Sequence, residues 1–228
     1  MTGFKNWLKQ EKNGLKNDFY AYPKGKILWI ILGIVLLFLA LFRLWTVISF
    51  QRMAQWDIWL VNQVEQLRNN TLDVFFLFLS NFASGYFIIV AFLILTFFLI
   101  KRKRKKAAFA VFLTLVGSGF FIWLFKNLFS RPRPFGYLSE QDCFSFPSGH
   151  TTIAFYFYGM LFNLITRFVK LRKRYVLVLA MVFGFLVFLV ALSRIYLGYH
   201  FLTDIVGGFL LGGVFLLISA LMIDFLYQ

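Results

Sequence analysis

Long apolar runs dominate the chain and alternate with short polar or basic segments. Six runs are long enough to be read as membrane-spanning helices, because about 20 helical residues cross a hydrocarbon core of roughly 30 Å. They cover residues 27–50, 74–100, 107–129, 150–169, 175–195 and 203–226. These runs lack the period-two alternation that a membrane β-barrel requires. The pattern predicts an all-α bundle of six transmembrane helices.

Two of the runs depart from an average span. Run 74–100 is long enough to need tilt or an overhang beyond the bilayer. Run 150–169 is the least apolar, because it opens with polar residues and contains Asn163. Run 27–50 has no small-residue cleavage site behind it, so we interpret it as a span rather than a signal peptide. We therefore expect a basic N-terminal segment, residues 1–26, followed by one membrane domain, residues 27–228.

The connections between the runs differ sharply in charge. Segments 1–26, 101–106 and 167–174 hold six, six and five basic residues, 17 of the 24 in the chain. With six spans these segments fall on one side of the membrane, which the positive-inside rule assigns to the cytoplasm. Both termini are then predicted to be cytoplasmic.

Composition agrees with a multi-pass protein of the cell membrane. Of 228 residues, 61% are hydrophobic and 14% charged, whereas soluble domains carry about 25% charged residues. A net charge of +15 suggests nucleic acid in a soluble chain. Here topology and attraction to anionic lipids account for the basic runs, and no interleaved base-stacking surface accompanies them. We expect a lipid partner and no nucleic acid.

Seven basic residues lie outside those segments, on the side where topology disfavours them. An anionic ligand is the simplest reason for their presence. Four of them gather near the ends of the third and fifth runs, namely Lys126, Arg131, Arg133 and Arg194.

The first candidate stretch follows the third run. Lys126 precedes the expected helix end by about one turn, and Pro132 and Pro134 bias Arg131 and Arg133 toward extended backbone. An arginine guanidinium can donate two parallel hydrogen bonds to phosphate oxygens, and a lysine ammonium attracts them as a point charge. The alternative is a group of cations snorkelling to the interface.

The second stretch is Pro147-Ser148-Gly149-His150, which opens the fourth run. Ser148 is a candidate N-cap, and Gly149 permits close approach of a ligand to the backbone. The unpaired amides of a first helical turn bind anions. A plain capping turn with an incidental His150 is the alternative.

The third stretch runs from Ser193 to Asp204. His200 and Asp204 are four residues apart, so on a helix they share a face and can hydrogen-bond. Such a bond fixes the imidazole tautomer and leaves the other ring nitrogen as base or nucleophile. Arg194 adds a further cation. A purely structural hydrogen bond is the alternative.

Together the stretches indicate phosphoryl transfer without a metal. The two histidines of the chain both fall in them, on the same predicted membrane face. One histidine would attack phosphorus while the other protonates the leaving oxygen, and the cations would stabilise the equatorial oxygens. A metal site is disfavoured because the surrounding Lys and Arg residues would repel a cation.

These three stretches resemble the signature of the type 2 phosphatidic acid phosphatase superfamily. The matching positions span residues 126–204: Lys126-x6-Arg133-Pro134, Pro147-Ser148-Gly149-His150 and Ser193-Arg194-x5-His200-x3-Asp204. Six spans with the signature on the outer face also resemble its bacterial membrane branch, which includes phosphatidylglycerophosphate and undecaprenyl diphosphate phosphatases.

The resemblance implies a role for each matching residue and implies no metal or cofactor. His200 would be the nucleophile that forms a phosphohistidine, Asp204 would orient it, and His150 would be the general acid. The substrate phosphate would be bound by Lys126, Arg133, Ser148, Gly149 and Arg194. Arg131 lies outside the signature, so the resemblance assigns it no role.

The expected activity is hydrolysis of a lipid phosphomonoester or diphosphate headgroup at the non-cytoplasmic face. Phosphatidylglycerophosphate, undecaprenyl diphosphate and phosphatidate all remain open as substrates. A lipid-linked phosphotransferase of the same fold would use the same phosphohistidine. An anion transporter is a more distant alternative, since the chain has no clear inverted repeat.

Overall fold

A computed structural model describes residues 33, 40, 52–134 and 144–227. The described residues form seven α-helices and no strand, in agreement with the predicted all-α class. The helices are α3 (Arg52–Glu65), α4 (Asn70–Asn81), α5 (Gly85–Lys101), α6 (Lys105–Phe129), α7 (Gly149–Phe168), α8 (Lys173–Tyr196) and α9 (Leu202–Leu226). The predicted N-terminal segment 1–26 and almost all of run 27–50 lie outside the described residues.

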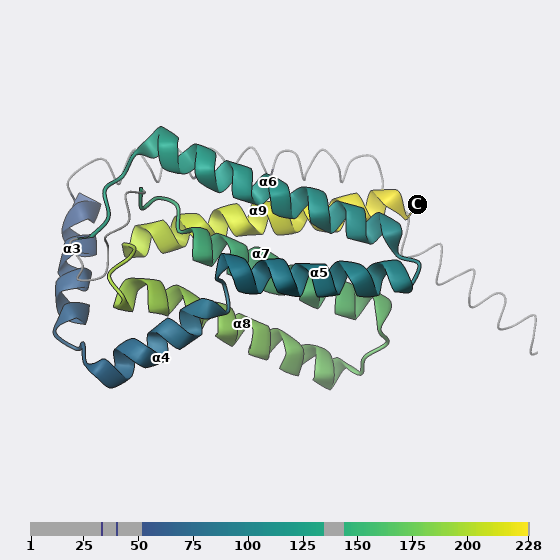
Figure 1. Cartoon of the computed structure of the whole chain (residues 1–228), viewed down its shortest axis with the longest axis horizontal. Helices are drawn as coiled ribbons and strands as arrows, with labels where there is room; N and C mark the ends of the chain where they lie inside the picture. The colour runs from purple at the N-terminus through teal and green to yellow at the C-terminus, as the bar shows by residue number, and fades with distance from the viewer. Residues whose placement is uncertain (1–32, 34–39, 41–51, 135–143, 228) are drawn as a thin grey trace, which may run out of the picture.

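Five helices, α5 to α9, run lengthwise through the bundle, while α3 lies across one end (Figure 1). Four segments are long and apolar enough to cross a membrane: Asn70–Lys101, Lys105–Phe129, Lys173–Tyr196 and Leu202–Leu226. They correspond to the second, third, fifth and sixth predicted runs. The chain is therefore a multi-pass membrane helical bundle.

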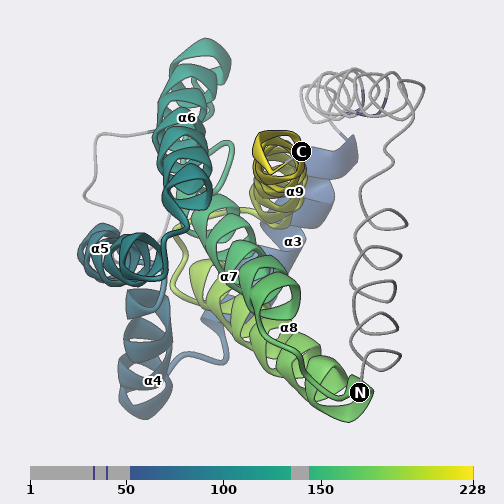
Figure 2. The same ribbon diagram turned by 90° about the vertical axis from the view of Figure 1, so that its right-hand side faces the viewer.

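Helix α7, the least apolar of the predicted spans, lies at the centre of the bundle (Figure 2). It packs against α6, α8 and α9, and each of its residues is buried or half-buried. A central helix faces protein rather than lipid, so it can carry polar side chains that find partners inside the bundle. Tyr156 and Thr114 of α6 illustrate this, with 2.7 Å between their hydroxyl oxygens. The low hydropathy of this run reflects its central position.

Run 74–100, predicted as a single long span, is divided into α4 and α5 at Phe82–Ser84. Ser84 caps α5, since its side chain accepts the Phe87 amide at 3.3 Å. The Tyr158 hydroxyl of α7 donates to the Phe82 carbonyl at 2.8 Å. A carbonyl freed at the break is thereby satisfied inside the protein, as a membrane environment demands. The break lets α4 diverge from α5 (Figure 2).

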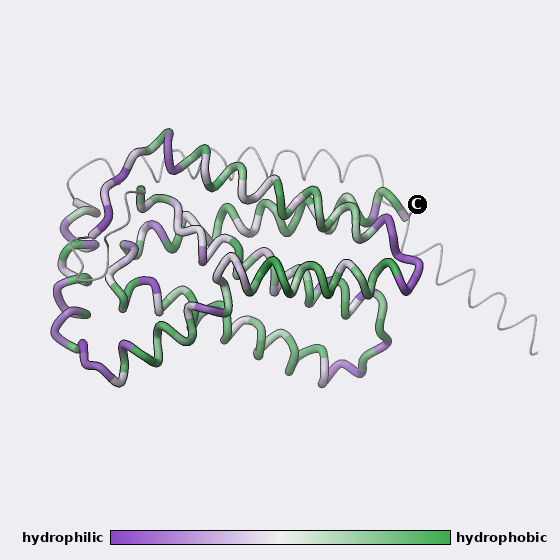
Figure 3. Tube along the Cα trace, viewed as in Figure 1, coloured by the Kyte–Doolittle hydropathy of each residue, from purple (hydrophilic) through white to green (hydrophobic). Residues whose placement is uncertain are grey.

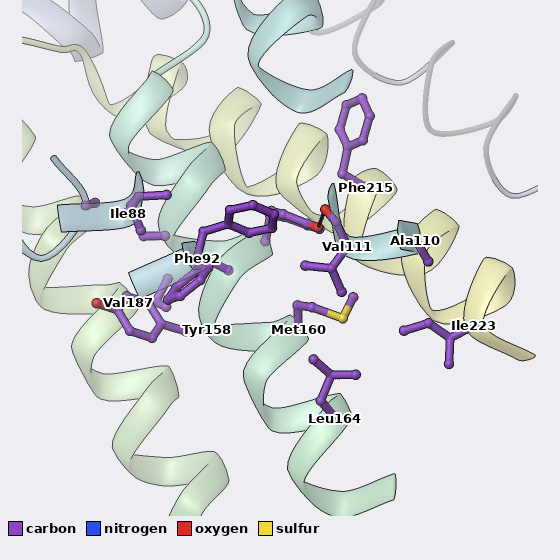
Figure 4. Packing of buried hydrophobic residues seen from close by; sticks show 14 of the residues in the cluster. Ile88, Phe92, Ala110, Val111, Tyr158, Met160, Leu164, Val187, Phe215 and Ile223 are labelled. Carbon is purple, nitrogen blue, oxygen red and sulfur yellow. Dashed lines mark hydrogen bonds between the residues drawn. The ribbon is translucent and has the colours of Figure 1, made fainter. Parts of the chain in front are cut away.

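The buried core joins all five lengthwise helices. Phe92 of α5, Val111 of α6, Met160 of α7, Val187 of α8 and Ile223 of α9 belong to one cluster of buried side chains (Figure 4). This cluster holds the helix ends in a fixed arrangement.

The two most closely packed helices are α7 and α9. A Cβ atom added to Gly212 would lie 2.6 Å from the Thr152 carbonyl oxygen, and one added to Gly208 would lie 2.9 Å from the Ser148 carbonyl oxygen. Glycines four residues apart form a small-residue stripe, which lets membrane helices approach backbone to backbone.

Polar residues concentrate at the two ends of the bundle (Figure 3). One end holds the basic segments 101–106 and 167–174, where Arg104 lies 4.4 Å from the Phe168 ring centre. The opposite end holds α3, the start of α7 and the start of α9 (Figure 1). The fold thus places these two basic segments at the end opposite the predicted site.

Gly212→Ala tests the close approach of α7 and α9. The added methyl group would overlap backbone that cannot move aside easily, so we expect a loss of roughly 1–3 kcal/mol in unfolding free energy. Thermal unfolding in detergent would measure it. Gly119→Ala in α6 is the matched control, because its Cβ meets no atom within 4 Å. Equal melting temperatures for the two variants would contradict the packing described here.

Candidate active site

The three sequence stretches converge at the end of the bundle where α6 and α8 finish and α7 and α9 begin. The Ser148 amide donates to the Asp204 carbonyl at 3.0 Å. This bond joins the residue that caps α7 to the first turn of α9. The predicted His150 and His200 stretches are therefore held side by side by backbone as well as by the glycine stripe.

His200 and Asp204 form the expected pair, with 3.3 Å between Nδ1 and the carboxylate Oδ2. Their geometry differs from the prediction, because His200 precedes α9 and Asp204 lies in its first turn. The Asp204 carboxylate also accepts the Phe201 amide at 2.9 Å. This is the reciprocal bond by which an acidic residue caps a helix start. The cap thus orients the carboxylate that contacts His200.

Burial lowers the pKa of His200 to about 4, and its hydrogen bond to Asp204 offsets only part of that effect. The imidazole is only 2% exposed, and nearby Arg194 and Lys126 also disfavour a second positive charge. His200 is therefore neutral at neutral pH. A neutral imidazole has a free electron pair on the nitrogen that does not face Asp204.

The start of α7 has the predicted capping geometry. Ser148 is fully buried, and its side-chain oxygen accepts the Thr151 amide at 3.4 Å. Gly149 and His150 are half-buried in the first turn. A Cβ on Gly149 would make an ordinary 3.5 Å contact with Ile122. Packing among the described residues therefore does not require glycine at this position.

The three predicted phosphate-binding cations surround the histidines. His150 interacts electrostatically with Lys126, Arg133, Arg194 and His200, which places all five groups within one small region. Lys126 donates to the Phe144 carbonyl, and Arg133 donates to the Tyr199 carbonyl at 3.0 Å. Both cations are thus held by the loops that frame the helix starts.

Arg194 is the most deeply buried of these cations, at 7% exposure. Its Nη1 donates to the Ser80 hydroxyl at 2.5 Å, and its guanidinium lies 4.3 Å from the Tyr199 ring centre. Its Nε has no hydrogen-bond partner among the described residues. A buried guanidinium donor left unpaired is costly, so this nitrogen is suited to an oxygen of a bound anion.

Arg131, to which the resemblance assigns no role, forms two ion pairs. Its guanidinium contacts Asp204 at 2.5 Å and Asp57 of α3 at 2.7 Å. Sequence reasoning also missed α3 and Asp57. The available signal was an acidic residue between Trp56 and Trp59, in a segment too short and polar to span a membrane.

Two of the basic residues on this face have protein partners and do not need the expected anionic ligand. Arg131 is neutralised by protein carboxylates, and Arg68 pairs with Asp73 at 3.0 Å. Arg194 retains the unpaired Nε described above.

Comparison with known proteins identifies a family and several relatives. Residues 107–227 match the PAP2 superfamily. Phosphatidylglycerophosphatase B of Bacillus subtilis is 36% identical over 88 residues, covering 38% of this chain and 43% of that protein. Human dolichyldiphosphatase 1 is 33% identical over 142 residues, covering 58% and 57% of the two chains. The chain thus matches about half the length of these curated relatives.

Two crystal structures are similar in fold. One is a transmembrane PAP2-type phosphatidylglycerolphosphate phosphatase from Bacillus subtilis, with a TM-score of 0.76 and 26% identity over 85% of this chain and 96% of that one. The other is Aquifex aeolicus LpxE, with a TM-score of 0.50 and 28% identity over 72% and 93%. The family match covers more than half of the chain and includes both histidines, Asp204 and the capped start of α7. The chain belongs to the PAP2 superfamily.

Proposed function

We propose that this protein is a membrane lipid phosphatase that works through a phosphohistidine at His200. The observation that carries the proposal is the arrangement of His200 beside Asp204, with His150 and three cations in the same small region. A neutral imidazole oriented by a carboxylate is a nucleophile, and surrounding cations stabilise the charge on a transferring phosphoryl group.

In the first step, Nε2 of His200 attacks phosphorus and the bond from phosphorus to the leaving oxygen breaks. The electron pair stays on that oxygen, and His150 supplies its proton, after the anionic substrate has offset the neighbouring cations that disfavour a protonated His150 in the free enzyme. Asp204 accepts a hydrogen bond from Nδ1 and stabilises the positive charge that develops on the ring. In the second step, water attacks phosphorus while His150 takes its proton. The bond from nitrogen to phosphorus then breaks, releasing phosphate and restoring neutral His200.

The phosphate oxygens would be bound by two kinds of donor. Positive charge comes from Lys126, Arg133 and Arg194. The Nε–H group of Arg194, which has no partner among the described residues, could donate to a phosphate oxygen. Ser148 and the Gly149 amide supply donors from the start of α7, where the helix dipole favours an anion. The cluster is strongly cationic, so we propose that turnover needs no divalent metal.

The substrate class follows from the position of the site. It lies at the end of a bundle whose sides expose large apolar residues such as Leu177, Val182 and Phe185. A lipid headgroup would reach the site while its chains remain in the bilayer. The names of the relatives specify a phosphatidylglycerophosphate and a dolichyl diphosphate. We propose a phosphomonoester or diphosphate lipid as the substrate class.

His200→Ala should reduce phosphate release by at least about 10³-fold, because the attacking nitrogen is lost. The rate of phosphate release should fall equally far in His200→Asn, although the asparagine amide can still donate a hydrogen bond to Asp204. Phosphate release would be measured in detergent with EDTA present, on phosphatidylglycerophosphate, undecaprenyl diphosphate and phosphatidate. The melting temperature of each variant checks that it is folded. Substantial turnover by either variant would exclude His200 as the nucleophile, and a wild type active only with added metal would exclude the metal-free mechanism.

We also propose that the site faces away from the cytoplasm, as the positive-inside rule indicates. In a Cys143→Ser background, cysteine would replace Gln66, in the exposed turn between α3 and α4. In a second variant it would replace Lys103, in the exposed turn between α5 and α6. A membrane-impermeant thiol reagent should label intact cells at position 66 and should reach position 103 only after the membrane is ruptured. The reverse pattern would place the site in the cytoplasm.

A further inference from the structure

Helix α3 contributes a buried carboxylate to the site from outside the three signature stretches. The helix lies across the end of the bundle (Figure 1), and Asp57 is only 2% exposed. Its neighbours Trp56, Ile58 and Trp59 are all more than half exposed. The amphipathic helix thus turns an acidic side chain inward while aromatic rings face outward, as interfacial helices do.

Asp57 makes hydrogen bonds to Arg131 and Thr203. One carboxylate oxygen accepts Nη2 of Arg131 at 2.7 Å and also the Thr203 hydroxyl. The other oxygen accepts the Thr203 amide at 3.2 Å. Asp57 therefore ties α3 to the first turn of α9 and holds Arg131 in place.

Arg131, held by Asp57, also contacts Asp204. Its Nη1 donates to Oδ1 of Asp204 at 2.5 Å and to the Thr203 hydroxyl at 2.7 Å. The guanidinium also lies 4.2 Å from the Phe201 ring centre. A planar guanidinium held at both ends has little freedom to rotate, so it fixes the position of Oδ1. With Oδ1 fixed, the contacts of Oδ2 define the plane of the Asp204 carboxylate.

The carboxylate plane matters because the two Asp204 oxygens have different partners. Oδ1 faces Arg131, whereas Oδ2 accepts the Phe201 amide and contacts Nδ1 of His200. Rotation of the carboxylate would move Oδ2 away from the imidazole. The charge of Asp57 also matters. Arg131 alone would neutralise Asp204, whereas with Asp57 the three groups carry a net negative charge beside His200.

We propose that Asp57 is a positioning residue for the reaction, which orients Asp204, and through it His200, by holding Arg131. This inference rests on the proposed phosphohistidine function. Asp57 and Arg131 do not touch the reacting atoms, so neither is a catalytic residue. A purely structural role for Asp57, as an anchor for α3, makes a different prediction about turnover.

The test measures kcat and KM for lipid phosphate release by Asp57→Asn, Arg131→Gln and the double variant. Asp57→Asn preserves side-chain shape but removes the charge that holds Arg131. We expect kcat to fall about 10- to 100-fold, the range found when the hydrogen-bond partner of a metal-binding histidine is lost, with KM changed less than about twofold. The double variant should be no slower than Arg131→Gln, because Asp57 acts through Arg131.

Asp73→Asn is the matched control. It removes a carboxylate from the Arg68–Asp73 pair, which lies at the same end of the bundle and makes no contact with Asp204. Its kcat should stay within about twofold of wild type. Asp57→Glu, which keeps the charge, should retain a higher kcat than Asp57→Asn. If the asparagine variant does not fold, Asp57→Glu is compared with Arg131→Gln instead, and a kcat no higher than that of Arg131→Gln would overturn the inference.

A kcat for folded Asp57→Asn within twofold of wild type would overturn the inference, even if its melting temperature fell. Fully additive losses in the double variant would overturn it too, because Asp57 would then act independently of Arg131. Equal kcat values for the Glu and Asn variants would show that the charge is irrelevant. If wild type and Asp73→Asn both released no phosphate, the proposed function would be wrong and this inference would fall with it.

Discussion

The close approach of α7 and α9 determines how the site is assembled. Gly208 and Gly212 allow the two backbones to come into contact. A hydrogen bond of 3.0 Å from the Ser148 amide nitrogen to the Asp204 carbonyl oxygen joins the starts of the two helices. His150 belongs to one of these starts, and Asp204 to the other. The nucleophile His200 lies in the short connection before α9 and contacts Asp204 of its first turn. The distance between general acid and nucleophile in the proposed reaction therefore depends on how these two helices pack. Side chains carried on such rigid elements need little reorganisation during catalysis.

The charged residues of the site form two groups. Around the histidines lie Lys126, Arg133 and Arg194, which suit an anionic substrate. Behind Asp204 lies Arg131, paired with Asp57. Buried charges at the edge of a bilayer are costly unless paired, and the two aspartates supply such a pairing for Arg131.

Much of this arrangement could be predicted from the sequence because it depends on local patterns. The predicted runs 107–129, 150–169, 175–195 and 203–226 agree closely with α6 to α9. Hydropathy could not reveal the break at Phe82–Ser84, because short polar interruptions of an apolar run do not show whether a helix bends or ends. The His200–Asp204 pair was predictable from spacing, although its geometry is that of a helix cap. The role of Arg131 was not predictable, since it depends on Asp57, which is 74 positions away in the chain.

Trapping the phosphorylated enzyme tests the central claim most directly. Wild-type protein would be mixed briefly with a lipid carrying a labelled terminal phosphate, quenched in base and digested for mapping of the labelled peptide. A phosphohistidine is stable in base and labile in acid, so the account predicts base-stable label on His200. Label on His150, a base-labile adduct on Asp204 recovered from a parallel sample quenched in acid, or turnover with no trapped intermediate would contradict it.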